Sequence, residues 1–351
     1  MQRAWGNKRR ITKVCYKRRY HRRYEFCCWV WVDYFHLISK ASAPGKAILF
    51  GEHFVVYGIK AILCAINKRV TITAEKIPEN KILVKSKIGE LDLPLNKPIS
   101  EINSPLKPFY YLANKMIEKH KQNTGIKIIV ESEIPSGVGL GSSSACCVAG
   151  AAAISRLFEE STKEKILEMA IEAERTIFQN TSGADCTVCT FGGLMEYDKS
   201  KGFSQIQSKS NFHLVIANSN IEHSTDEVVS KVRKFKEKNE KTFSDMCQKE
   251  SELINRVSTM LKNNDLEGLG KSMHENEEYL EILGISNDKL RDMVKIAGEA
   301  SFGAKITGAG GGGCIISLTD ESNLEKTILK LRERNYDCFS VKIDFNGLNT
   351  F

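Results

Sequence analysis

The sequence predicts an α+β protein built from two closely joined units. Segments with strand-like alternation and segments with helical periodicity are mixed along the chain, and a second set of strands and helices begins near Phe212. A length of 351 residues is sufficient for two hydrophobic cores. An apolar content of 42% and a charged content of 27% are typical of soluble globular proteins. We therefore expect a basic extension over 1–37, an N-terminal domain over 38–205 and a C-terminal domain over 206–351.

The first unit alternates strands with helices. Apolar alternation, or a short apolar run after a turn at Pro44-Gly45, predicts strands at 47–50, 69–76, 81–85 and 126–133. Helical periodicity predicts helices at 106–122, 143–158 and 163–178. A hairpin over 194–207 is expected to end this unit.

The second unit follows the same mixed plan. Strands are predicted at 212–217, 314–318 and 338–344. Charged amphipathic helices are predicted at 224–262, 265–283, 287–300 and 322–335. A glycine-rich loop over 308–313 precedes the middle strand.

The positive charge of the chain lies in the extension. Residues 1–39 carry ten Lys or Arg and two acidic residues, whereas 40–351 carry 41 of each, so the net charge of +8 belongs to the extension. All three tryptophans lie there as well. A nucleic-acid-binding arm, a targeting segment and a disordered or misassigned extension are the three interpretations. We favour the last, with the authentic start near Leu37.

A second glycine-rich loop is the most informative segment of the chain. It reads Pro135-Ser-Gly-Val-Gly-Leu-Gly-Ser-Ser-Ser-Ala145, with serines placed where they suit the N-cap of a helix. Such a loop aims several amide N–H groups at one point with a helix dipole behind them, so it can bind polyphosphate. A tight turn whose glycines serve packing is the alternative. The loop has neither a Walker A ending nor the spacing of a dinucleotide fingerprint.

One carboxylate falls where a helix should be apolar. The apolar face of the helix over 163–178 consists of Ile166, Leu167, Ala170, Ile171, Ala173, Ile177 and Phe178. Glu174 lies near the middle of this face. Because burial of a lone carboxylate is costly, Glu174 needs a cation or hydrogen-bond donors. A structural salt bridge or exposure at the helix end is one explanation, and Mg²⁺ beside substrate phosphates is the other.

Further polar residues are ambiguous one by one and informative together. Asp185 in a Gly/Ser turn, Lys46 at a strand start and the pair Glu52-His53 in a loop each have an ordinary structural explanation. Combined with the loop and with Glu174, they supply a phosphate cradle, a metal carboxylate, a carboxylate base and a lysine. Phosphoryl transfer to an alcohol requires such a set.

Three segments resemble the signature motifs of the GHMP kinases. They are Ser42-Ala-Pro-Gly-Lys-Ala-Ile-Leu-Phe-Gly-Glu-His53, the loop from Pro135 to Ala145, and Ile306-Thr-Gly-Ala-Gly-Gly-Gly-Gly-Cys314. The first motif, continued by Val55-Val-Tyr-Gly58, is similar to the mevalonate kinase branch in particular. The resemblance covers residues 38–345. It implies a two-domain GHMP kinase fold, with an N-terminal domain like domain 2 of ribosomal protein S5 and a ferredoxin-like C-terminal domain.

Carried over position by position, the resemblance implies ATP- and Mg²⁺-dependent phosphorylation of the C5 hydroxyl of mevalonate, a step of isoprenoid biosynthesis. Asp185 would be the base, assisted by Lys46, and Ser143 with Glu174 would hold Mg²⁺. The positions expected to hold mevalonate are Glu52, His53, Val55 and Thr225. Those expected to bind ATP are Pro135, Gly137, Gly139, Leu140, Gly141, Ser142, Ser143, Ser144, Gly308 and Gly310.

Other functions fit the sequence less well. A sister GHMP kinase acting on homoserine, a sugar or phosphomevalonate is the nearest alternative, but the Gly51-Glu-His53 continuation speaks against it. A nucleic-acid-binding S5-like protein would carry basic residues over its folded part, which is neutral. The loop spacing disfavours a dinucleotide-dependent oxidoreductase.

The partners and location follow from composition and resemblance. No apolar run approaches the ~20 residues of a membrane span. We therefore expect a small-molecule substrate, no nucleic acid or membrane partner, reduced cysteines and a cytoplasmic location. The resemblance suggests a homodimer.

Overall fold

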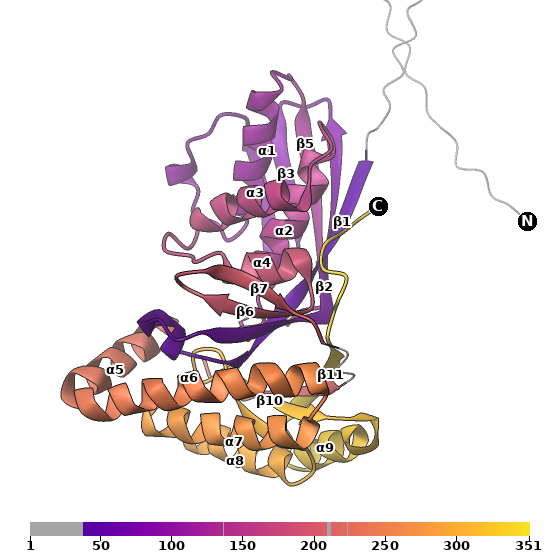
Figure 1. Ribbon diagram of the computed structural model, residues 1–351. Coiled ribbons are helices and arrows are strands. Elements are labelled where there is room, and N and C mark those ends of the chain that lie inside the picture. Colours follow the sequence, from indigo (N-terminus) through magenta and orange to yellow (C-terminus); the bar gives the residue numbers. More distant parts are fainter. Residues whose placement is uncertain (1–37, 136, 209–211, 223) are drawn as a thin grey trace, which may run out of the picture. The chain divides into compact units, whose positions relative to one another are not determined.

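Two β-sheets with their helices make up the part of the chain that the structure describes (Figure 1). The structure is a computed structural model, and it describes residues 38–135, 137–208, 212–222 and 224–351. The basic extension over 1–37 and the expected start near Leu37 lie outside these residues. Ile38–Phe351 form one compact unit, and its mixture of helices and strands confirms the predicted α+β class.

The first sheet has eight strands in the order β12-β1-β2-β5-β3-β4, with the β6–β7 hairpin attached to β2. Its strands are β1 (Ile38–Phe50), β2 (Ala61–Ile77), β3 (Lys81–Ser86), β4 (Gly89–Pro94), β5 (Gly125–Ser132), β6 (Leu194–Asp198), β7 (Gly202–Ile206) and β12 (Asn349–Thr350). Among the strands of the described residues, only β3 and β5 pair in parallel. The long β1–β2 pair spans the sheet and continues toward the second sheet (Figure 1).

Helix α2 is the centre of the first lobe. The helices of this lobe are α1 (Lys107–Lys119), α2 (Ser142–Ser155), α3 (Lys163–Arg175) and α4 (Ala184–Phe191), with short 3₁₀ turns η1 (Phe54–Tyr57) and η2 (Ile99–Glu101). α2 contacts β1, β2 and the other three helices of the lobe. Its run of Ala, Gly and Cys has no polar face, which suits a helix buried on nearly all sides.

The second sheet has four antiparallel strands in the order β11-β8-β10-β9. They are β8 (His213–Asn218), β9 (Gly303–Thr307), β10 (Cys314–Thr319) and β11 (Asp337–Lys342). The accompanying helices are α5 (Thr225–Lys238), α6 (Glu240–Asn263), α7 (Leu266–Ile282), α8 (Asp288–Gly298) and α9 (Glu321–Glu333). Gly270 of α7 and Gly303 of β9 are in backbone contact, since a Cβ on Gly303 would lie 2.3 Å from the Gly270 carbonyl oxygen.

Several predicted boundaries are wrong. The helix expected over 224–262 is two helices separated at Asn239, and the helix expected over 163–178 ends at Arg175, which leaves Phe178 55% exposed. The turn expected at Pro44-Gly45 lies inside β1 as a register shift, because a bulge tolerates a proline without an N–H. Helix α4 and strand β4 were not predicted.

The last residues return to the first sheet. β12 pairs with Ala41 and Ser42 of β1, and Arg69 of β2 forms an ion pair with Asp344. The Arg69 guanidinium also donates to Ser42 and to the Gly347 carbonyl oxygen, at 2.7 Å for the latter. The predicted domain boundary between 205 and 206 stays a prediction, and the residues after β11 belong structurally to the first lobe.

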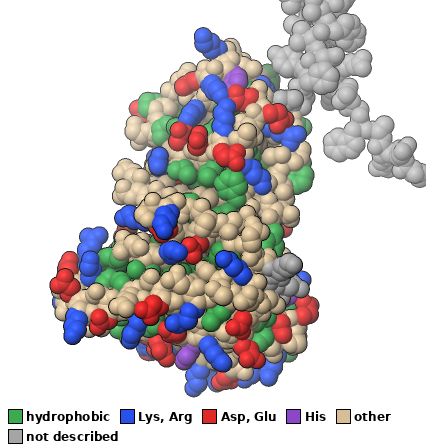
Figure 2. Space-filling model, in the orientation of Figure 1, with side chains coloured by type: hydrophobic (Ala, Val, Ile, Leu, Met, Phe, Trp, Pro, Cys, Tyr) green, Lys and Arg blue, Asp and Glu red, His purple; other side chains and the backbone are tan. Residues whose placement is uncertain are grey.

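Charged side chains cover the helices of the second lobe. Lys and Arg are interspersed with Asp and Glu over this part of the face shown in Figure 2, as expected for solvated amphipathic helices. Across the described residues, none of the helices combines the length and the apolar character needed to cross a bilayer.

Candidate active site

The phosphate-loop candidate has a backbone suited to anions. Gly137, Gly139 and Gly141 have φ angles of 73°, 76° and 72°, a left-handed conformation that favours glycine. Alternation of such residues with ordinary ones turns amide N–H groups inward and makes a concave anion site. Gly141 is the N-cap of α2, and no side chain caps this end, so the expected serine cap is wrong. The serine hydroxyls are therefore not engaged in capping the helix.

The loop is attached to the strand that carries Lys46. The Lys46 backbone N–H donates to the Leu140 carbonyl oxygen at 2.9 Å. A Cβ on Gly141 would lie 2.7 Å from Cγ of Lys46, so only glycine allows the approach seen here. Pro135, Gly137 and Gly139 are exposed, Gly141 is half-buried, and Leu140 is buried. The loop therefore presents its backbone outward next to the lysine.

Lys46 and Asp185 are brought together as the sequence predicted. Lys46 Nζ lies 3.1 Å from Asp185 Oδ2. The lysine side chain is 7% exposed and that of Asp185 is 34% exposed. Asp185 lies in the first turn of α4, where a carboxylate interacts favourably with the helix dipole. The arrangement is a buried ammonium beside a carboxylate that an incoming alcohol can reach.

Glu174 is buried at the end of α3 and accepts hydrogen bonds from hydroxyl groups. Its exposed fraction is 4%, Ser144 donates to Oε1, and Thr181 Oγ1 donates to Oε2 at 2.5 Å. None of the described basic side chains forms an ion pair with it, so the salt-bridge explanation does not apply there. Ser143, the predicted metal ligand, is half-buried, and the hydroxyl that reaches Glu174 is that of its neighbour Ser144.

The oxygen groups around Glu174 fit Mg²⁺. A carboxylate and hydroxyls are hard donors, and Mg²⁺ is bound through one or two carboxylates together with substrate phosphates. Among the described residues, no group of three or more His, Cys, Asp and Glu side chains is arranged to hold a metal ion. A Mg²⁺ site here would therefore depend on Glu174, on serine hydroxyls and on the nucleotide itself.

Residues 51–53, which we call the corner, join β1 to η1 and lie against the second lobe. Glu52 is 2% exposed, and its Oε1 is ion-paired with Lys305 of β9 while Oε2 has no hydrogen-bond partner. Burial raises the pKa of Glu52, against the ammonium of Lys305. His53 Nε2 donates to the Ala309 carbonyl oxygen at 2.7 Å, and burial lowers the pKa of His53. Glu52 is thus held by the residue that precedes the third motif, and His53 by a residue within that motif.

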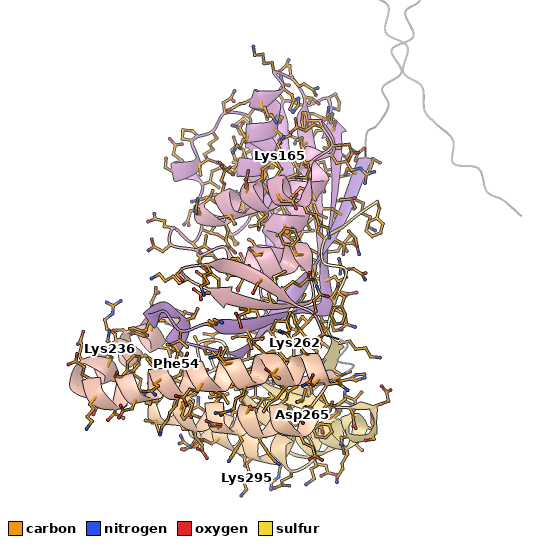
Figure 3. The ribbon with its side chains drawn as sticks, viewed as in Figure 1. Phe54, Lys165, Lys236, Lys262, Asp265 and Lys295 are labelled. Carbon is orange, nitrogen blue, oxygen red and sulfur yellow. The ribbon has the colours of Figure 1, made fainter. Side chains whose placement is uncertain are left out.

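The other predicted substrate residues lie in η1 and at the start of α5. Val55 is half-buried in η1, whose aromatic residues pack on α6: the ring centroids of Tyr57 and Phe243 are 4.8 Å apart. Phe54, labelled in Figure 3, stacks on the same Phe243 with ring centroids 6.0 Å apart. Thr225 is exposed at the start of α5, and in the described structure no hydrogen bond joins it to the corner or to Asp185.

The third-motif loop is tied to its own lobe. Gly311 N–H donates to the Ile285 carbonyl oxygen at 2.6 Å, and a Cβ on Gly310 would lie 2.8 Å from the same oxygen. Gly308 is half-buried with open space where a Cβ would be. Gly308 is therefore the predicted ATP-binding residue of this loop that has room beside it.

Sequence reasoning missed a buried polar cluster beside the corner. Glu250 of α6 accepts from Gly51 N–H at 3.1 Å and from Asn276 Nδ2 at 2.8 Å and 2.9 Å. Glu277 of α7 accepts from Ile306 N–H at 2.7 Å. Burial raises the pKa of each carboxyl to about 7. The sequence did contain a sign of this cluster, because Lys305 interrupts an apolar strand and Glu250 falls on the buried face of α6.

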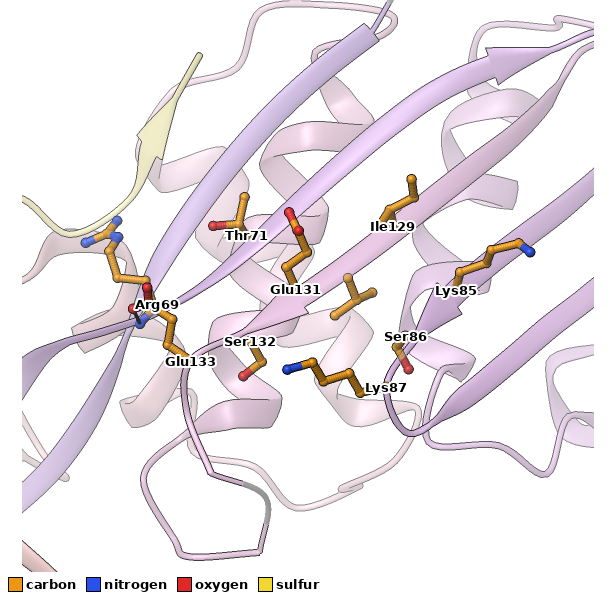
Figure 4. A pocket seen from close by; sticks show the side chains of 10 residues that line it. Arg69, Thr71, Lys85, Ser86, Lys87, Ile129, Glu131, Ser132 and Glu133 are labelled. Atoms are coloured by element: carbon orange, nitrogen blue, oxygen red, sulfur yellow. Dashed lines mark hydrogen bonds between the residues drawn. The ribbon is translucent and has the colours of Figure 1, made fainter. Parts of the chain in front are cut away.

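A groove on the first sheet does not belong to this site. It has a volume of about 560 Å³ and is lined by side chains of β2, β3 and β5, among them Thr71, Lys85 and Glu131 (Figure 4). None of the predicted site residues lines it. Charged pairs such as Lys81 and Asp92, 2.7 Å apart, lie on nearby strands, which is typical of a solvated sheet face.

Comparison with known proteins agrees with the geometry. The GHMP kinases N terminal domain matches residues 108–193, and the GHMP kinases C terminal domain matches 258–337. A mevalonate kinase of Pyrococcus furiosus is 35% identical over 305 residues, which cover 81% of this chain and 90% of that protein.

Solved structures give the same result. The crystal structure of Methanococcus jannaschii mevalonate kinase has a TM-score of 0.77 and 30% identity, covering 89% of this chain and 99% of that one. The L. major mevalonate kinase in complex with R-mevalonate has a TM-score of 0.74 and 23% identity, covering 88% of this chain and 96% of that one. The predicted two-domain GHMP kinase fold is confirmed, and the chain belongs to the mevalonate kinase family of the GHMP kinases.

Proposed function

We propose that this protein transfers the γ-phosphoryl group of ATP to the C5 hydroxyl of mevalonate, giving 5-phosphomevalonate. The observation that carries the proposal is the ion pair of Lys46 and Asp185, 3.1 Å long, next to a glycine loop shaped for phosphates. Relatives that are 30–35% identical are named mevalonate kinases, and one structural neighbour was solved with R-mevalonate.

Asp185 takes the proton of the alcohol in this proposal. A primary alcohol is a poor nucleophile near pH 7, and a positioned carboxylate contributes roughly 10²–10⁴-fold as general base. The proton moves from the C5 hydroxyl to the Asp185 carboxylate while the alcohol oxygen forms a bond to the γ-phosphorus. The bond from that phosphorus to the bridging oxygen of ADP breaks, and ADP leaves.

Lys46 has two tasks in the same step. Its ammonium keeps the Asp185 carboxylate next to the reacting hydroxyl, and it offsets negative charge that develops on the transferred group. Because the lysine side chain is 7% exposed, little water screens this interaction. The buried position of Lys46 therefore increases its electrostatic effect.

Glu174 and the serines of the loop form the proposed metal side of the site. Glu174 and Ser143 would be ligands, with Ser144 and Thr181 hydrogen-bonded to Glu174. When bound, Mg²⁺ neutralises phosphate charge and orients the γ-phosphoryl group. The loop amides of 137–144 and the loop at Gly308 and Gly310 would hold the phosphates.

The corner is the proposed receiver of mevalonate. Since His53 donates its Nε2–H to Ala309, its Nδ1 is left as an acceptor for a substrate hydroxyl. Glu52 Oε2, buried and without a hydrogen-bond partner, is a second acceptor. Val55 would line the apolar part of the substrate site, and Thr225 at the start of α5 would close it.

A substrate panel tests the proposal. The purified protein is incubated with Mg²⁺-ATP and mevalonate, homoserine, galactose or phosphomevalonate, and ADP release is measured with an enzyme-coupled assay. Turnover with mevalonate alone is the expected result. Preferential turnover of another alcohol would assign the chain to a sister activity of the GHMP kinases, and no turnover with any alcohol would refute the kinase assignment.

We also propose a cytoplasmic location and a homodimer. The location is supported by the cysteines of the described residues, all of which are free thiols. The homodimer is supported by family resemblance, and sedimentation of the purified protein tests it directly.

A further inference from the structure

Strand β9 and the start of the loop that follows it contact the first motif through every second residue from Lys305 to Ala309. Lys305 Nζ is ion-paired with Glu52, and Thr307 Oγ1 donates to the Ile48 carbonyl oxygen at 2.9 Å. The Ala309 carbonyl oxygen accepts from His53 at 2.7 Å. Lys305 and Thr307 are two apart on β9, so their side chains face the same side of the strand. The carbonyl group of Ala309, two residues beyond Thr307, extends the contact with β1 and the corner. The contact joins segments more than 250 residues apart.

Lys305 is the charged member of this contact. Its side chain has an exposed fraction of 0%, and its Nζ donates to the Ile306 carbonyl oxygen at 2.5 Å in addition to Glu52. A fully buried ion pair usually contributes little more to stability than apolar side chains of the same size. Its value here is geometric, because it fixes the direction of the Glu52 carboxylate.

Ionisable groups from three other elements face the pair of Lys305 and Glu52. They are Glu250 of α6, Glu277 of α7 and Lys46 of β1, and His53 lies beside Glu52. Glu250 binds the corner through Gly51 N–H, and Glu277 binds β9 through Ile306 N–H. Lys305 therefore stands among three buried carboxyl groups, and it is ion-paired with the one that belongs to the corner.

We propose that Lys305 is a positioning residue, which holds the Glu52 carboxylate and thereby sets the corner in the place where it receives the alcohol substrate. This inference rests on the proposed function, in which Glu52 and His53 bind that substrate. Lys305 acts through Glu52 and has no task in binding ATP. In this proposal β9 helps to position the alcohol substrate through Lys305, whereas the glycine loop that follows β9 helps to bind the nucleotide.

Replacement of Lys305 by Met separates these tasks. K305M should raise the KM for the alcohol by roughly tenfold or more, because misplacement of a positioning group by about 1 Å can cost up to 10²-fold. The KM for ATP should stay within about twofold of wild type, since the phosphate loop is attached to Lys46 and not to Lys305. K305R, which keeps the charge, should restore part of the alcohol KM.

The pH dependence of kcat/KM for the alcohol distinguishes a positioning role of Lys305 from a merely structural one, which would leave that dependence unchanged. The ammonium of Lys305 opposes the burial that raises the pKa of Glu52, so in K305M the carboxylate takes up its proton at higher pH. The acid limb of kcat/KM for the alcohol should therefore shift to higher pH in K305M. In the double variant E52Q/K305M that shift should disappear while the alcohol KM stays high.

A matched control breaks a different ion pair between distant segments. R69M removes the partner of Asp344, and Arg69 lies outside the proposed site. It should lower the thermal midpoint without changing either KM or the acid limb. An alcohol KM in K305M within twofold of wild type, with an unmoved acid limb, would overturn the proposal.

Two outcomes keep this test separate from that of the function. If K305M does not fold, E52Q/K305M is measured instead, because it leaves no unpaired charge at the pair; a wild-type alcohol KM in that variant would equally overturn the role of Lys305. If wild-type protein turns over another alcohol in place of mevalonate, the proposed function fails, and the KM readouts are taken with that alcohol.

Discussion

Replacement of Asp185 by Asn tests the central step of the proposed reaction. The amide has the size of the carboxylate but cannot accept the proton of the alcohol. Loss of a general base costs roughly 10²–10⁴-fold in rate. At 1.36 kcal/mol per factor of ten, this is about 3–5 kcal/mol of transition-state stabilisation. We therefore expect kcat to fall by two to four orders of magnitude.

The structure predicts a small effect of the same change on folding and on ATP binding. The Asp185 side chain is 34% exposed, and in D185N the amide oxygen can still accept a hydrogen bond from the buried Lys46, so the ammonium keeps a partner. Asp185 lies on α4 and is not one of the loop residues that would bind the phosphates. ATP affinity, measured by calorimetry, should stay within about twofold, and the thermal midpoint should change by at most a few degrees.

Asp344→Asn is the matched control for this variant. Asp344 also pairs with a basic residue, the half-buried Arg69, but it lies at the return of the C-terminal segment to the first sheet. D344N should lower the thermal midpoint and leave kcat unchanged. If D185N kept kcat within tenfold of wild type, or if D344N lost as much turnover, Asp185 would not be the base.

Three further variants test the metal side, the loop and the buried carboxyl cluster. Glu174→Gln should raise the Mg²⁺ concentration that gives half-maximal rate by roughly tenfold, because the amide is a weaker metal ligand than the carboxylate. The control E172Q, on the exposed side of α3, should not change that concentration. Gly141→Ala should lower kcat more than Gly137→Ala. Both glycines have φ near 70°, so both replacements strain the backbone, but only the Cβ at position 141 would contact Lys46, at 2.7 Å. Glu250 has a pKa raised to about 7, so its contribution to stability is complete below pH 4.5 and is lost as the pH rises through 7. Urea unfolding of E250Q should lack this loss, which amounts to about 3 kcal/mol.

The chemistry of the site was more predictable than its exact atoms. Glu174 was identified from helical periodicity alone, and it is buried as expected. Ser143 came from the family resemblance and stays a prediction as a metal ligand. The hydroxyl that donates to Glu174 in the structure is that of its neighbour Ser144, and no periodicity rule specified that contact.

Elements that follow no long local pattern were the ones missed. Helix α4 has eight residues, about two turns, which is too short for periodicity to reveal. The break at Asn239 separates two helices with similar amphipathic patterns, so their apolar periodicity gave no sign of an end. Lys305 could be flagged as a lysine in an apolar strand, but its partner Glu52 is 253 residues away and no local rule specifies the pairing.

The hydrogen-bonding groups of β1 explain why the three motifs meet. In an antiparallel strand, alternate residues direct N–H and C=O toward the same edge. Lys46 and Ile48 are two residues apart, so their backbone groups point to the same edge of β1, the one away from β2. At that edge the N–H of Lys46 donates to the Leu140 carbonyl oxygen. The N–H of Ile48 donates to the Thr307 hydroxyl, which in turn donates to the Ile48 carbonyl oxygen. Buried backbone groups need partners, so this strand end is stable when the loop of the second motif and the strand of the third both lie against it. The side chains of Lys46 and of the corner are then held between the loop and the strand. This is why the proposed catalytic lysine and substrate corner lie beside the proposed phosphate loop, although that loop and β9 are far from them in sequence.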